Sequence, residues 1–130
     1  MTSLDQARAY FKGDRFATEN GAVIDEVTDT YAVCSLTLND RHRNAMGNVM
    51  GGVLFMLGDF AFAVASNFGK HPTVSTTSQI TFLRPAQGNR LTARAERIRE
   101  GRSTVYYEIS VTDSLGRLVA RITASGSIVE

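Results

Sequence analysis

Hydrophobic and polar positions divide the chain into segments with different patterns. Residues 3–12 place Leu4, Ala7 and Phe11 on one side of a short amphipathic helix, with Ser3 as the predicted N-cap. Residues 51–68 predict a second helix, whose apolar side chains cover nearly every face and therefore require burial on most sides. Alternation of apolar and polar residues predicts strands over residues 22–28, 31–38, 73–85, 90–100, 103–113 and 117–129.

Short turns join the last four strands, and short connections favour antiparallel pairing. A long antiparallel sheet that curls around the apolar helix would supply the burial that this helix requires. We therefore predict an α+β fold in which the sheet wraps one central apolar helix. Residues 1–130 are expected to form a single domain, whose residues 1–19 make an N-terminal helical segment.

Composition limits the classes of partner and site. The formal net charge of +1 over 130 residues offers no general attraction for nucleic acid or for an anionic membrane. The single cysteine, Cys34, excludes an intramolecular disulfide, and two histidines do not form a usual zinc site, so no metal or cofactor is expected. The N-terminus lacks the apolar core of a signal peptide, and glycines and Asp59 interrupt the long apolar stretch, so we expect a cytoplasmic protein without a membrane span.

Asp59 is the only charged residue between Arg43 and Lys70. A buried carboxylate is unfavourable unless it is paired or hydrogen-bonded, and burial raises its pKa. Asp59 is therefore a candidate general base or nucleophile. The alternative is a structural aspartate that is hydrogen-bonded to a strand.

Two glycines, Gly51 and Gly52, stand at the predicted start of the apolar helix. The unpaired N–H groups of a helix start can bind a phosphate or the oxyanion of an acyl-transfer intermediate. The alternative is that the glycines only allow a tight turn or close packing. Asp59 follows Gly52 by two helical turns, about 10 Å, on nearly the same face. It is too far from Gly51 of its own helix to act with it on one carbonyl, so a site shared between two subunits of a symmetric dimer is expected.

The stretch "HRNAMGNVMGGVLFMLGDFAFAVA" resembles the hotdog-fold thioesterases of the phenylacetic-acid-degradation (PaaI-like) type. The family pattern is an Asn, a Gly, a His-Gly-Gly, and a helical Asp eight residues after the first Gly of the pair. Asn44, Gly47, Gly51, Gly52 and Asp59 match that spacing. The resemblance continues through "ITFLRPA" and "EGRSTVYYEISVTDSLGRLVA" and covers about residues 20–129.

This resemblance implies a hotdog fold and hydrolysis of an acyl-CoA thioester by a homodimer, which pairs into a homotetramer in part of the family. It implies that Asp59 is the base or nucleophile and that Gly51 supplies an oxyanion N–H from the neighbouring subunit. Asn44 would help to hold the thioester or the water. A Ser or Thr early in the next strand assists the aspartate; the alignment places Ser75 there, with Thr76 and Thr77 as competitors.

One position departs from the family pattern, because the His of His-Gly-Gly is Met50. A thioether is a poor hydrogen-bond acceptor and cannot donate. His42 is a candidate to replace the missing histidine. The alternative is that it is a solvated loop residue. Because the aspartate and the backbone donors remain, a thioesterase is the leading interpretation. A non-catalytic acyl-CoA binding protein or sensor is the second, and a hotdog dehydratase or hydratase ranks last because the helix holds no histidine.

Further substrate contacts are expected around these residues. Gly52 and Met50 adjoin the helix start, and Arg84 and Arg102 are candidate cations for the CoA phosphates, with Arg102 as the best single candidate. The apolar side chains that could line an acyl pocket, unless they are plain core, are Met46, Phe55, Met56, Phe60 and Phe62. The sequence leaves the acyl group open.

Overall fold

The computed structural model describes residues 2–129. Its elements, in chain order, are α1 (Ser3–Phe11), α2 (Arg15–Glu19), β1 (Val23–Val27), β2 (Tyr31–Thr37), the 3₁₀ turn η1 (Asp40–His42), α3 (Gly51–Asn67), β3 (Thr73–Phe82), β4 (Arg90–Glu100), β5 (Thr104–Thr112) and β6 (Leu118–Ile128).

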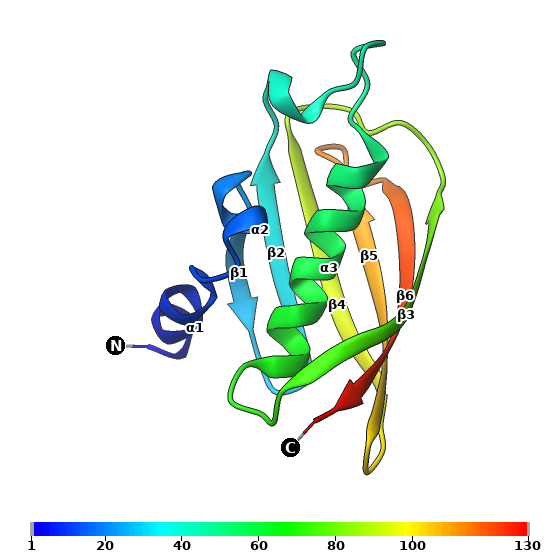
Figure 1. The fold of residues 1–130 in the computed structure, drawn as a ribbon. Helices are drawn as coiled ribbons and strands as arrows, with labels where there is room; N and C mark the ends of the chain where they lie inside the picture. Colours follow the sequence, from blue (N-terminus) through cyan, green and yellow to red (C-terminus); the bar gives the residue numbers. More distant parts are fainter. Residues whose placement is uncertain (1, 130) are drawn as a thin grey trace.

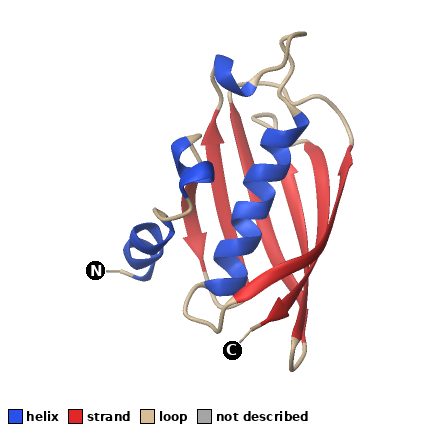
Figure 2. Ribbon diagram, viewed as in Figure 1, coloured by secondary structure: helices blue, strands red, loops and turns tan. Residues whose placement is uncertain are grey.

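All six strands form one sheet in the order β1-β2-β4-β5-β6-β3, and every neighbouring pair is antiparallel. The sheet curves around α3, which lies along its concave face (Figures 1 and 2). The predicted α+β hotdog arrangement, a curled antiparallel sheet around one apolar helix, is therefore confirmed.

The helix α3 lies deep against the sheet because its sheet-facing side chains are apolar or absent. Leu57, Ala61 and Val64 are fully buried. Gly58 marks the closest approach, since a Cβ there would lie 2.2 Å from Cδ1 of Ile122 on β6. Alternate side chains of the strands point inward, as the sequence pattern predicted. On β5 the inward residues are Val105, Tyr107, Ile109 and Val111.

The N-terminal segment differs from the prediction in two details. Thr2, not Ser3, is the N-cap of α1: the Asp5 N–H donates to Thr2 Oγ1 at 3.1 Å, and the Thr2 N–H donates to the Asp5 carboxylate at 3.2 Å. The hydroxyl of Ser3 is one residue too late for this reciprocal cap. A separate short helix, α2, follows α1 and packs on α3 through Ala17, which is buried.

The turn between β5 and β6 is organised by one carboxylate. Asp113 is 5% exposed and accepts hydrogen bonds from the backbone N–H groups of Gln87, Leu115 and Arg117 at 3.0–3.1 Å. The Arg117 guanidinium donates to the same carboxylate at 2.8 Å. This pair of a buried carboxylate and a partly exposed guanidinium ties the β3–β4 connection to the β5–β6 turn.

The two edge strands of the sheet, β1 and β3, differ in what contacts them. At the β1 edge, Arg8 on α1 donates to the carbonyl of Ile24 at 2.9 Å. At the other edge, β3 pairs only with β6, and the side chains of Val74 and Phe82 are 51% and 55% exposed. Within residues 2–129 no element pairs with the outer edge of β3. The unpaired outer edge of a strand of this length can pair with another strand.

Candidate active site

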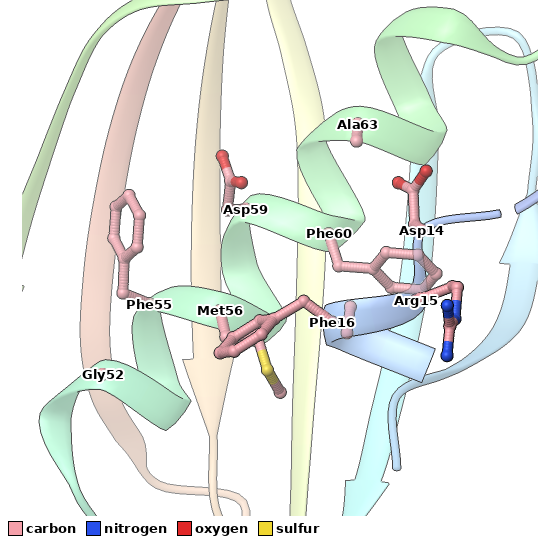
Figure 3. Close-up of a pocket in the computed structure, with 10 residues that line it drawn as sticks. Asp14, Arg15, Phe16, Gly52, Phe55, Met56, Asp59, Phe60 and Ala63 are labelled. Atoms are coloured by element: carbon pink, nitrogen blue, oxygen red, sulfur yellow. The ribbon is translucent and has the colours of Figure 1, made fainter. Parts of the chain in front are cut away.

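A cavity of about 470 Å³ lies between α3 and α2, on the side of α3 that faces away from the sheet (Figure 3). Two carboxylates open into it, and most of the other lining side chains are apolar. The lining residues are Asp14, Arg15, Phe16, Ala17, Gly52, Phe55, Met56, Asp59, Phe60 and Ala63. Pockets of this size and character are typical of small-molecule sites.

Asp59 stands on α3 between the aromatic residues of this cavity (Figure 3). Its side chain is half-buried. Burial, and then the negative charge of Asp14, raise the pKa of the Asp59 carboxyl, and no hydrogen bond or ion pair within residues 2–129 opposes this shift. A carboxyl group whose pKa is raised is a better proton acceptor, and it can return that proton later in a reaction.

The predicted shared face of Gly52 and Asp59 is confirmed, because both residues line the same cavity. The N-cap of α3 is Met50, whose side chain makes no capping hydrogen bond. Gly51 faces an adjacent cavity of about 350 Å³, which Phe82 and Arg84 also line. A Cβ at Gly51 would lie 2.9 Å from the tip of the exposed Phe82 ring, which would have to shift to make room for it. The glycines place no side chain of their own over the N–H groups of the helix start.

Both readings of His42 from the sequence are wrong. The side chain is buried, its Nδ1 accepts from the Asn39 N–H at 3.0 Å, and its Nε2 therefore donates to the carbonyl of Asn20 at 2.7 Å. His42 is neither a solvated loop residue nor a replacement for the histidine missing at Met50. It fastens the loop before α3 to the end of α2.

Residues 46–120, more than half of the chain, match the thioesterase superfamily. The chain belongs to this superfamily. Within the superfamily, the chain is similar to thioesterases of the PaaI type. The acyl-coenzyme A thioesterase PaaI of Escherichia coli is 33% identical over 115 residues, which cover 88% of this chain and 82% of that protein.

Solved structures agree with the sequence relatives. The structure of the E. coli PaaI protein superposes with a TM-score of 0.91 at 29% identity, covering 98% of this chain and 94% of that chain. A variant of the phenylacetic acid degradation protein PaaI from Thermus thermophilus superposes with a TM-score of 0.84 at 30% identity, covering 89% of this chain and 100% of that chain. This superfamily member therefore shares nearly its whole length with PaaI proteins.

Asn44 organises the loop before α3 in this thioesterase-superfamily chain. Its side-chain oxygen accepts from the N–H groups of Met46 and Asn48 at 3.0 and 3.1 Å. Gly47, in the same turn, has a φ of 83°, which favours glycine. The observed contacts of Asn44 therefore hold the loop, and its contact with a substrate stays a prediction.

The remaining predicted site residues lie apart from the Asp59 cavity within one protomer. Ser75, Thr76 and Thr77 are exposed on β3, where Thr76 occupies a bulge and donates to the carbonyl of Ser125 at 3.1 Å. Arg102 is exposed in the β4–β5 turn, at the end of the sheet opposite the start of α3 (Figure 1). Their roles in a site shared between subunits stay predictions.

Among the apolar candidates, Phe55, Met56 and Phe60 do line the cavity, but Phe62 does not. Phe62 packs edge-to-face on Tyr107 with ring centroids 5.2 Å apart, so it belongs to the core.

The sequence interpretation missed the contribution of α2. Asp14, Arg15 and Phe16 enter the cavity wall from this short helix. One signal was present, since an Asp that directly follows Gly13 is a common start for a helix.

Within residues 2–129, no helix is long and apolar enough to cross a membrane. The same residues contain no group of three or more His, Cys, Asp or Glu side chains placed to hold a metal ion.

Proposed function

We propose that this protein is an acyl-CoA thioesterase that hydrolyses a small to medium acyl or aryl thioester to the free acid and CoA. The observation that carries the proposal is Asp59, an unpartnered carboxyl group with a raised pKa in an apolar cavity. Membership of the thioesterase superfamily and the name of the E. coli relative support the same reaction.

The proposed reaction uses Asp59 in one of two ways. As a general base, Asp59 takes a proton from water while the water oxygen bonds to the thioester carbonyl carbon. The oxyanion then accepts a hydrogen bond from the Gly51 N–H, the C–S bond breaks, and the leaving thiolate takes the proton back from Asp59. As a nucleophile, Asp59 attacks the carbonyl carbon itself and expels the thiolate, and water then hydrolyses the mixed anhydride.

The proposed active enzyme is a homodimer with sites between subunits, with pairing of dimers into a tetramer as the larger assembly. Gly51 and Asp59 face different cavities of one protomer, so a carbonyl in contact with both needs a second copy to bring them together. The open edge of β3 offers a place for that copy to pair. In such an assembly Asn44 and Ser75, with Thr76 and Thr77 as alternatives to Ser75, are the proposed assisting residues.

Coenzyme A carries phosphate groups that require cations. Arg84 lines the cavity next to Gly51 and presents a guanidinium that can bind phosphate oxygens in pairs. Arg102, exposed in the β4–β5 turn, is the second proposed contact for the nucleotide end. No resident cofactor or metal has a part in the proposed reaction.

The experiment is an assay of thiol release from acetyl-, hexanoyl-, decanoyl-, benzoyl- and phenylacetyl-CoA. Asp59→Asn should lower turnover by about 100-fold or more, which is the usual contribution of a general base. Asp25→Asn is the matched control, because Asp25 is a carboxylate on β1 that does not line the cavity. Turnover that survives in Asp59→Asn would refute the proposed role of Asp59.

A second candidate function, acyl-CoA binding without turnover, is favoured by the position of Met50. Its side chain lies over the helix start, since a Cβ at Gly52 would lie 2.7 Å from Met50 Cε. If the wild type binds acyl-CoA but releases no thiol from any substrate, this second function replaces the first. Met50→His then restores the family residue, and turnover gained by that variant would identify Met50 as the cause.

A further inference from the structure

The most exposed aromatic side chain of the Asp59 cavity comes from α2. Phe16 is 76% exposed, whereas Phe60, across the same cavity, is 3% exposed. Figure 3 shows the Phe16 ring at the border of the cavity with Phe55, Met56 and Asp59. What distinguishes Phe16 from the other exposed apolar side chains, such as Tyr10 and Leu115, is that it lines the cavity that holds Asp59. An apolar group in that cavity could therefore bury surface against the Phe16 ring.

Phe16 does not anchor α2 to the rest of the molecule. Ala17, the next residue, is 7% exposed and provides the buried contact of this five-residue helix. On the carboxyl side, His42 fastens the chain through its hydrogen bond with the carbonyl of Asn20. The ring of Phe16 is therefore presented to the cavity by a segment that is held by other residues.

The chemistry around Phe16 suits an acyl group better than the nucleotide end of CoA. Phe55, Met56 and Phe60 surround the space with apolar surface. Among residues 2–129, Arg15 is the one cation that lines the cavity; it is paired with Glu19 and points away from Asp59 (Figure 3). The lining therefore offers mostly apolar surface, against which an apolar chain or ring would be buried next to Phe16.

Phe60 lies between this cavity and a neighbouring one. A second cavity, of about 490 Å³, lies beyond it between α1, α2 and β1, and Phe60 lines both spaces. The Phe60 ring is held edge-to-face by Phe11, with centroids 6.2 Å apart. An acyl group that reaches Asp59 would therefore have Phe16 and Phe60 as apolar walls of the first cavity.

We propose that Phe16 is a specificity-determining residue that covers the apolar part of the acyl group while its thioester carbonyl lies at Asp59. This inference rests on the proposed thioesterase function. Because acetyl has a single methyl group and so little apolar surface to bury, the residue discriminates larger acyl groups from acetyl. Substrate preference is thus set in part by a helix that lies outside the residues matched to the superfamily.

The experiment compares kcat/KM for acetyl-, hexanoyl- and phenylacetyl-CoA in the wild type, Phe16→Ala and Phe16→Leu. Phe16→Ala should lower kcat/KM for the two larger substrates by about 10- to 100-fold, the range expected when one large apolar contact is lost. Acetyl-CoA should change by less than about 2-fold, and Phe16→Leu should recover part of the loss. Tyr10→Ala is the matched control, because Tyr10 is an aromatic residue on α1 that is 72% exposed and does not line the cavity.

Two results would overturn the inference while the proposed function stands: an equal loss on all three substrates, which marks a structural role, or no loss on any. If the wild type releases no thiol from any thioester, the proposed function fails instead. Calorimetric titration of CoA and hexanoyl-CoA then tests Phe16 directly. Phe16→Ala should weaken binding of hexanoyl-CoA about 10-fold or more and leave CoA unchanged, and equal affinities in both proteins would overturn the inference.

Discussion

The close approach of α3 to the sheet predicts an unusual response to Gly58→Ala. Alanine favours a helix over glycine by about 1 kcal/mol. Here, however, the new Cβ would lie 2.2 Å from Ile122 Cδ1 and 3.4 Å from Ile109 Cγ2. Ile122 is 1% exposed, so its terminal methyl group has no free space to enter. Overpacking of this kind costs about 1–3 kcal/mol, and we expect a net destabilisation of about 1 kcal/mol.

The atom responsible can be removed separately. Ile122→Val deletes Cδ1 and should by itself lower the free energy of unfolding by about 1 kcal/mol. In that background the nearest remaining atom of residue 122 is Cγ1, 3.6 Å from a Cβ at Gly58, which is an ordinary contact. Gly58→Ala should then stabilise the protein by up to about 1 kcal/mol, so the sign of its effect reverses.

Urea unfolding of the four proteins, followed by circular dichroism at one protein concentration, measures this double-mutant cycle. The expected coupling between Gly58 and Ile122 is about 2 kcal/mol in favour of the double variant. Effects of Gly58→Ala that agree in both backgrounds within about 0.5 kcal/mol would refute the reasoning, because the obstruction would then lie elsewhere.

Three further predictions follow from buried polar groups. Asp59→Asn should raise the midpoint of thermal unfolding at pH 7, because burial, and then Asp14, raise the pKa of Asp59 above its unfolded value. Ionised Asp59 therefore destabilises the folded wild type, and this loss of stability grows as the pH rises through about 4. The stability gained by Asp59→Asn should vanish below about pH 4, and the decline of kcat/KM on the acid side should occur above about pH 4. Burial of Asp113 is outweighed by hydrogen bonds from Arg117, Gln87 and Leu115, which hold its pKa well below its usual range. Asp113→Ala should therefore lower the free energy of unfolding by about 3 kcal/mol at pH 7, with a difference from the wild type in urea that shrinks as the pH falls below about 4. Burial raises the pKa of the Cys34 thiol, so a disulfide reagent should label Cys34 only after unfolding, and rapid labelling of the native protein would contradict its burial.

The parts of the fold that could be predicted from the sequence are those set by local periodicity. The apolar surface of residues 51–68 required a covering sheet, and α3 is the central helix. The isolated charge of Asp59 predicted a carboxyl group with a raised pKa, which the structure confirms. In both cases the signal lies within a few turns of one helix, where spacing alone determines which side chains share a face.

The features that escaped prediction depend on contacts between distant segments. His42 looked like a loop residue because its partner, the carbonyl of Asn20, is 22 residues away in sequence. Phe16 gave no signal in the sequence because the cavity that it lines is completed by residues of the distant helix α3. The strand order also has no local signal, since β3 lies at the sheet edge beside the last strand rather than beside β4.

The pairing of β3 with β6 has a consequence for the order of events during protein synthesis. β3 emerges from the ribosome before β4, β5 and β6, yet within residues 2–129 it pairs with β6 alone. Until Leu118–Ile128 has been made, β3 has no partner and the apolar surface of α3 is incompletely covered. Such non-local topologies fold slowly and expose aggregation-prone surface on the way. A nascent chain that stops before β6 would therefore be a substrate for chaperones, and the domain can complete its fold only when its last strand becomes available.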